Sequence, residues 1–355
     1  MRRDHHHRSN WGSTCGFGKV VRRILRLDFV VKSIDILQCS KRIRSSSNKF
    51  WQLGATMKKI PYWTDNTPRP PDLPVGSTPT DVDVAVVGSG LTGLNAAIEI
   101  AKAGLNTAVF EKETLGWGAS SRNGGFMIPG LFLSVDKLEK RYGKESAKAF
   151  YDWSKKSVDY VEELVTTEGI DCDLDRSGHI TLGTKPSHFP HLMAYHEYLQ
   201  NEYDDEDTEI LQPDEVGTEI FSPIFHGGII HKGGAGLDPA KYVYGLAQVA
   251  TRYGAQLYEN TEVKGIKSEN GSYRLMTSKG ELNAREVLIA TNGYTTSMLP
   301  RVRFGIFPAA CYSIVTEPLP ASLQKEISPT GKIFSDSKYF INYFRLLADG
   351  RVLVR

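Results

Sequence analysis

The sequence predicts an α/β fold in which buried parallel strands alternate with helices. Three consecutive features predict it. The run VDVAVVG at 82–88 is apolar and rich in β-branched residues, as buried parallel strands are. The turn GSGLTG at 88–93 has the spacing G-x-G-x-x-G and leads into a helical stretch at 94–103. A second strand, NTAVFE, ends at Glu111. This order indicates a Rossmann-like βαβ unit.

Each glycine of the turn has a mechanical reason. Gly88 permits the tight bend, Gly90 keeps side-chain atoms away from a pyrophosphate, and Gly93 lets the helix pack closely on the strand. The helix that follows points its N-terminal amides at the diphosphate. Glu111, about 20 residues further on, is where a carboxylate accepts the ribose hydroxyls. The run predicts a dinucleotide site, although the turn alone does not separate NAD from FAD.

The segment after Glu111 helps to separate the two cofactors. Residues 116–125, GWGASSRNGG, place small and polar residues and one arginine directly after the second strand. This loop resembles that of the D-amino-acid oxidase and glycine oxidase superfamily of flavoproteins, and most of all the γ-glutamylputrescine oxidoreductase branch. In that branch a PYW segment, here 61–63, precedes the glycine turn. The loop departs from the branch at Ser121, which stands where the branch has glycine.

Further segments carry the same resemblance in the expected order. They are 234–266, 286–295, 307–319 and 343–354. The resemblance implies a Rossmann-like FAD-binding domain with an inserted α+β substrate domain that is incomplete at the C-terminus. The implied organisation is a basic extension at 1–59, a proline-rich arm at 60–80, FAD-binding parts at 81–145 and 226–298, and substrate-domain parts at 146–225 and 299–355.

The resemblance also implies which residues hold FAD. Val263 would contact the adenine through its backbone, and 290–293 would close over the cofactor. Arg122 has two alternatives, which are to offset diphosphate charge or to pair with a local carboxylate. The residues expected to bind the cofactor are Gly88, Ser89, Gly90, Leu91, Thr92, Gly93, Glu111, Lys112, Ser120, Ser121, Arg122, Asn123, Gly124, Gly125, Val263, Ala290, Thr291 and Gly293.

The activity implied by the resemblance is oxidation of a C–N bond in a small amine or amino acid. Hydride passes to the flavin, the imine hydrolyses, and oxygen or another acceptor reoxidises the flavin. Arg345 is expected to hold a substrate carboxylate, and Tyr343 lies on the same strand face. The loop after the second strand contains no histidine, so we expect non-covalent FAD. The alternatives are an NAD(P)-dependent dehydrogenase and an inactive FAD-domain fragment.

The resemblance places further family segments beyond the last residues, DGRVLVR. These would be a glycine pair, more substrate-domain strands and a segment that closes on the flavin ring. We therefore expect this chain to bind FAD weakly or not at all and to have little activity. A continuation of the reading frame past Arg355 would restore the enzyme interpretation.

Charge separates the first 59 residues from the rest. They hold 14 Lys and Arg against 3 acids, which leaves 29 basic and 38 acidic residues for the remainder. A mildly acidic globular part gives no reason to expect nucleic acid as a partner. The basic segment is interpreted as a targeting segment, a membrane-surface helix, or a non-native extension before Met57. Its histidines at 5–7 are expected to be a solvated tail, not a metal site.

The four cysteines, at 15, 39, 172 and 311, form no CxxC pair, which favours a reducing compartment and gives no zinc pattern. No apolar run reaches the roughly 18 residues of a membrane span. We expect an intracellular, cytoplasmic protein, or an organellar one if 1–59 is a transit segment. Residues 144–168 predict a long amphipathic helix with an apolar face that includes Phe150, and the acidic run at 201–211 predicts a solvated surface.

Overall fold

The computed structural model describes residues 58–71, 78–309 and 311–355. The interpretations of the basic segment, up to residue 57, lie outside this part of the chain. Every helix and strand named below belongs to one unit, Lys59–Ile220 with Phe225–Arg355. Within the described residues, no helix is long and apolar enough to span a membrane, and no three His, Cys, Asp or Glu side chains gather to hold a metal ion.

The predicted βαβ unit forms the centre of a six-stranded sheet. β1 (Asp81–Val87) pairs in parallel with β2 (Thr107–Phe110) on one side and with β11 (Gly280–Ile289) on the other. The other strands are β8 (Gln256–Tyr258), which is parallel to β2, and the antiparallel β9 (Val263–Glu269) and β10 (Ser272–Thr277). The order is β8-β2-β1-β11-β10-β9. All three predicted features of the βαβ unit are confirmed.

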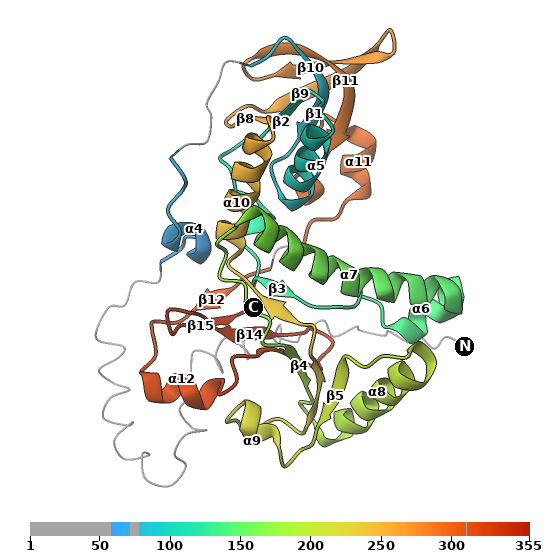
Figure 1. The fold of residues 1–355 in the computed structure, drawn as a ribbon, viewed down its shortest axis with the longest axis vertical. Helices are drawn as coiled ribbons and strands as arrows, with labels where there is room; N and C mark the ends of the chain where they lie inside the picture. The colour runs from blue at the N-terminus through green and yellow to red at the C-terminus, as the bar shows by residue number, and fades with distance from the viewer. Residues whose placement is uncertain (1–57, 72–77, 310) are drawn as a thin grey trace, which may run out of the picture. The chain divides into compact units, whose positions relative to one another are not determined.

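Two helices pack on this sheet and on each other. α5 (Leu91–Lys102) follows the glycine turn and contacts β1 and β2, and α10 (Pro239–Arg252) lies against it (Figure 1). α10 begins sharply because the Asp238 side chain accepts hydrogen bonds from the amides of Ala240 and Lys241, with Pro239 at the first helical position. Ten residues of α10 are buried, so this helix carries much of the core.

The second sheet has seven strands in the order β12-β15-β14-β13-β4-β6-β5. β4 and β13 are parallel, and the other neighbours are antiparallel. Because β6 belongs here, the sequence range 226–298 contributes to both sheets. The strands are β4 (His179–Leu182), β5 (Thr208–Leu211), β6 (Gly228–His231), β12 (Ile314–Val315), β13 (Ile333–Asp336), β14 (Tyr343–Leu346) and β15 (Val352–Val354).

The long amphipathic helix is α7 (Lys144–Glu168), which ends at Gly169 in the left-handed conformation. Its apolar face is buried or partly buried as predicted except at Phe150, which is 43% exposed and meets the Tyr142 ring edge to face. Figure 1 shows α7 leading from α6 (Val135–Tyr142). The remaining elements are α4 (Tyr62–Asn66), β3 (Phe126–Met127), α8 (Phe189–Tyr203), α9 (Val216–Glu219), β7 (Ala235–Gly236), α11 (Pro300–Gly305), α12 (Ala321–Ile327) and the short 3-10 turns Ala119–Ser121, Pro186–His188 and Asn292–Tyr294.

The acidic run at 201–211 is not simply a solvated surface, as the sequence predicted. Asp205 is 2% exposed, where it accepts a 2.5 Å hydrogen bond from the Tyr151 hydroxyl and pairs with Lys155 at 3.3 Å. A carboxylate is buried here because partners on α7 satisfy it.

Candidate functional site

The turn after β1 has no room for side chains. A Cβ on Gly88, whose φ is +106°, would lie 2.6 Å from the Ala290 carbonyl oxygen. A Cβ on Gly93 would approach the Gly88 carbonyl far inside the 3.0 Å that real Cβ contacts keep. At Gly90 the obstacle would be the Ser120 hydroxyl, 2.8 Å away. Gly88 and Gly93 therefore permit the bend and the close helix packing that the sequence predicts. Gly90 permits the approach of Ser120 from the loop at 116–125, and its predicted place beside a pyrophosphate stays a prediction.

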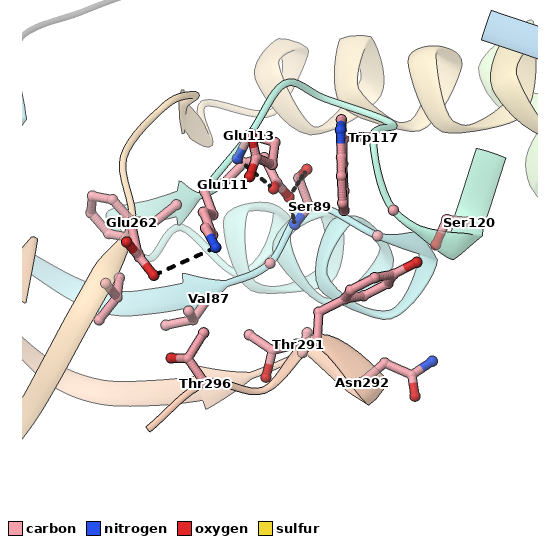
Figure 2. A pocket seen from close by; sticks show the side chains of 18 of the residues that line it. Val87, Ser89, Glu111, Glu113, Trp117, Ser120, Glu262, Thr291, Asn292 and Thr296 are labelled. Atoms are coloured by element: carbon pink, nitrogen blue, oxygen red, sulfur yellow. Dashed lines mark hydrogen bonds and ion pairs between the residues drawn. The ribbon is translucent and has the colours of Figure 1, made fainter. Parts of the chain in front are cut away.

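Glu111 lies beside this turn, directly after β2. Its Oε2 accepts hydrogen bonds from the Ser89 amide at 3.1 Å and the Ser89 hydroxyl at 2.7 Å (Figure 2). Its Oε1 accepts one from the Glu113 amide at 3.0 Å. Three donors of the protein thus fix the carboxylate, and each oxygen retains lone-pair capacity. Contact of Glu111 with a ribose stays a prediction.

These groups border a cavity of about 200 Å³. It is lined by five segments at or near strand ends of the six-stranded sheet, namely 87–90, 110–113, 116–120, 262–263 and 290–298 with gaps. Figure 2 shows side chains from these segments around one space. The lining contains the predicted cofactor residues Gly88, Ser89, Gly90, Glu111, Lys112, Ser120, Val263, Ala290 and Thr291.

The other nine predicted cofactor residues lie outside this lining. Leu91, Thr92 and Gly93 form the first turn of α5. Gly293 lies in the 3-10 turn after β11, beside lining residues Asn292 and Tyr294. The remaining five, Ser121, Arg122, Asn123, Gly124 and Gly125, form the second half of the loop after β2. Their role toward a cofactor stays a prediction.

The loop at 116–125, called here the second loop, is fixed by its own polar groups. The Leu91 amide, at the start of α5, donates to the Ser120 hydroxyl at 3.1 Å. The Asn123 side chain donates to the carbonyls of Ala119 and Ser120 and accepts from the Gly125 amide at 2.8 Å. Ser121, which replaces a glycine of the branch, is fully buried and donates to the Gly116 carbonyl. The serine thus adds a bond within the loop.

Aromatic side chains border the cavity, which the sequence did not predict. Trp117 and Tyr294, both in the lining, meet edge to face with ring centroids 5.7 Å apart. The guanidinium of Arg122 lies 4.4 Å from the Trp117 ring centroid. Within the described ranges no carboxylate forms an ion pair with Arg122. Its guanidinium contacts the Trp117 ring instead, so the predicted pairing with a local carboxylate is not seen in this part of the chain. Trp117 lies in the loop at 116–125, so the sequence already contained this indication of an aromatic wall.

Two further lining residues form an ion pair that the sequence did not predict. Lys112 lies 3.8 Å from Glu262, and both side chains are partly exposed (Figure 2). Such pairs contribute little to stability. The ammonium group of Lys112 therefore remains able to contact an anion at the cavity.

The substrate-contact candidates lie elsewhere, on β14. Arg345 is 8% exposed, and its Nη1 donates to the carbonyls of Gly125 at 3.0 Å and Leu237 at 3.1 Å. Its Nε is buried without a hydrogen-bond partner among the described residues. Burial lowers the pKa of this guanidinium below its usual value. The ring of Tyr343 meets the edge of Phe126 at 5.4 Å. The structure brings both residues beside the end of the second loop, and contact with a substrate stays a prediction.

The donor set fits an adenine dinucleotide. A glycine turn without side chains, the amides at the start of a helix, and a fixed carboxylate beside them are the groups that bind diphosphate and ribose in such sites. Strand and helix amides supply the positive end, and no metal ligand cluster is present in the described part of the chain.

Comparisons with known proteins agree with this fit. A family model described as FAD dependent oxidoreductase matches residues 83–355. The probable oxidoreductase OrdL of Rhizobium meliloti is 30% identical over 292 residues, 82% of this chain and 68% of that protein. The γ-glutamylputrescine oxidoreductase of Escherichia coli is 29% identical over 272 residues, 76% of this chain and 63% of that protein. The chain thus spans about two thirds of the length of such relatives.

A solved structure shares the fold. The glycine oxidase of Geobacillus kaustophilus superposes with a TM-score of 0.60 at 24% identity, covering 78% of this chain and 71% of that one. A likeness at this identity establishes the fold, and the family match over 83–355 establishes the relationship. The chain belongs to the family of FAD-dependent oxidoreductases that includes the D-amino-acid oxidases.

Proposed function

We propose, in place of the weak or absent FAD binding expected from the sequence, that this chain binds FAD non-covalently at the glycine turn and takes part in oxidising a C–N bond of a small amine or amino acid. The observation that carries the proposal is the convergence of the glycine turn, Glu111 and the second loop on one cavity, in a chain of this family. Relatives named γ-glutamylputrescine oxidoreductase and glycine oxidase support an amine or amino-acid substrate.

Different residues would bind different parts of the cofactor. The amides at the start of α5 and the Ser120 hydroxyl would bind the diphosphate, and Glu111 would accept the ribose hydroxyls. Val263 would meet the adenine through its backbone. Lys112, Ala290 and Thr291 line the same cavity and would complete its walls.

When bound, FAD supplies the acceptor for the hydride that leaves the carbon beside the substrate nitrogen. The chain's own contribution is positioning. Arg345 would hold a substrate carboxylate through the part of its guanidinium that the carbonyls of Gly125 and Leu237 leave free. Tyr343, on the same strand face, would line the substrate side. A general base is not required if the amine arrives neutral.

Two finer points belong to the same proposal. FAD would be released by denaturation, because no histidine stands between Glu111 and Phe126 to attach it. The compartment would be intracellular and reducing, since Cys172 and Cys311, the two cysteines in the described part, are free thiols.

Titration of the purified chain with FAD tests the proposal, with NADP and free flavin as comparison ligands. We expect quenching of flavin fluorescence with FAD, no response to NADP, and recovery of all flavin in the supernatant after acid precipitation. An amine and amino-acid panel assayed for peroxide release then tests the substrate class. Absence of FAD binding up to about 1 mM, which corresponds to only about 4 kcal/mol of binding free energy, would overturn the proposal.

A further inference from the structure

Within the proline-rich arm at 60–80, the segment Pro61–Arg69, to which the name arm is restricted from here on, precedes β1 and contacts four distant parts of the chain. α4 lies within it and packs against α10 (Figure 1). The arm carries a tryptophan, Trp63, that is only 7% exposed and belongs to the main hydrophobic core. A helix of five residues has no stability of its own, so tertiary contacts hold it in place.

Trp63 makes a directed contact with the second loop. Its indole Nε1–H donates to the carbonyl of Asn123 at 2.8 Å. Asn123 is the residue whose side chain ties together both ends of the 119–125 stretch. The hydrogen bond from Trp63 therefore fixes the residue on which the conformation of the second loop depends.

The same tryptophan lies over Arg345. The guanidinium carbon of Arg345 is 5.9 Å from the Trp63 ring centroid. On another side a Cβ at Gly236 would lie 2.8 Å from that carbon, so the guanidinium packs closely against the glycine backbone. Arg345 in turn holds the Gly125 carbonyl, two residues beyond Asn123. Trp63 and Arg345 thus form hydrogen bonds with two carbonyls of the second loop, those of Asn123 and Gly125.

Two further anchors fix the arm on the C-terminal side of this contact. The Thr67 hydroxyl donates to Asp238 Oδ2 at 3.1 Å, at the start of α10. Arg69 forms an ion pair with Glu259, whose other oxygen accepts the Leu115 amide at 2.5 Å, immediately before the second loop. The first anchor is at the start of α10, which contacts the 3-10 turn Ala119–Ser121, and the second binds the residue before the loop.

We infer that Trp63 is a positioning residue for the cofactor site: through its indole N–H it holds the second loop, and with it Arg345, in the geometry that FAD requires. The inference rests on the proposed function. A tryptophan that only fills the core acts through its apolar area, and phenylalanine replaces most of that area. The N–H bond to Asn123 is the part that phenylalanine removes.

The variant Trp63→Phe tests the inference, with Tyr62→Phe as the matched control. Tyr62 lies on the same helix, and its hydroxyl donates to Asp349 at an exposed position. Hydrogen exchange of the FAD-free chain reports the loop directly. We expect faster exchange in residues 119–126 of Trp63→Phe and wild-type exchange in Tyr62→Phe. Amides of β10 serve as the reference for global opening, and thermal unfolding of each variant is measured alongside.

FAD titration of the same proteins supplies the second readout. Loss of one buried hydrogen bond weakens FAD binding on the order of 3- to 10-fold in Trp63→Phe, and Tyr62→Phe binds as the wild type does. A wild-type chain that binds no FAD overturns the proposed function and the inference with it. A wild type that binds FAD while Trp63→Phe binds it equally well overturns the inference alone. Faster exchange in β10 as well as in the loop also overturns it, because the residue then acts on global stability.

Discussion

The turn between β1 and β2 and the seven-stranded sheet differ in how far along the chain their polar groups find partners. Beside β1, Glu111 accepts from Ser89, 22 positions earlier. On the seven-stranded sheet, His179 of β4 contacts the Ser335 hydroxyl at 2.9 Å, 156 positions later, and Arg345 reaches Gly125 across 220 positions. The first arrangement depends on a short contiguous stretch, whereas the second exists only when most of the chain is folded.

Among the variants that test the local arrangement, Gly93→Ala should have the largest effect. The added methyl would meet the Gly88 carbonyl, so α5 must move away from β1 and the turn must open. We expect a loss of about 2–3 kcal/mol in the free energy of unfolding and no measurable FAD binding. Denaturant unfolding and FAD titration measure the two effects.

Gly217→Ala is the matched control for that variant. Gly217 lies inside α9, and a Cβ there would meet nothing within 4 Å. The change should stabilise the protein by about 1 kcal/mol or less. Equal effects of the two substitutions would show that the close approach at Gly93 has no special importance.

Glu111→Ala tests the local contact between Glu111 and the glycine turn more finely. It removes a carboxylate that three donors fix, and we expect FAD binding to weaken by about 1–3 kcal/mol. Ser89→Ala, which removes only the 2.7 Å hydroxyl bond, should weaken FAD binding by about 1 kcal/mol. Flavin affinity that is unchanged in both variants would mean that the ribose contact lies elsewhere.

The pH dependence of stability tests the long-range contacts of the seven-stranded sheet. Burial, with the neighbouring His231, lowers the pKa of His179 well below its usual 6.5. The unfolded chain therefore takes up the proton first as pH falls. Stability from this group is complete above pH 6.5 and is lost below it, by at most about 1.4 kcal/mol per pH unit. Thermal unfolding at pH 7.5, 6.5 and 5.5 measures the loss, and burial also lowers the pKa of His231, which adds in the same direction.

His179→Gln checks the origin of that slope. The substitution keeps a polar side chain beside Ser335 and removes the titrating group. The variant should lose less stability between pH 6.5 and 5.5 than the wild type does. An identical pH profile would assign the acid sensitivity to other groups.

The sequence predicted the contiguous elements well. β1, the glycine turn, α5 and the position of Glu111 follow from local periodicity and turn chemistry, which act over a few residues. The prediction for α7 was right in its bounds and wrong at Phe150. Periodicity predicts which face of a helix is apolar, but it does not predict how far along the helix the neighbouring elements cover that face.

The long-range partners were beyond sequence reasoning for a physical reason. Arg345 was predicted from its place on a strand, but nothing near it in the sequence identifies the carbonyls of Gly125 and Leu237 as its acceptors. Asp205 lies in an acidic run that reads as solvated, yet Tyr151 and Lys155 on α7 bury it. Trp63 was noted only as part of a motif, and its hydrogen bond to Asn123 requires the tertiary structure.

The arm has a consequence for the order of events during translation. It leaves the ribosome before all of its partners, since Asn123 follows Trp63 by 60 positions and Asp349 follows Tyr62 by 287. At ordinary elongation speeds the last of these partners appears tens of seconds after the arm. Docking of the arm therefore closes chain loops of 60 to 287 positions late, and a nascent chain exposes Trp63 to solvent and chaperones until then.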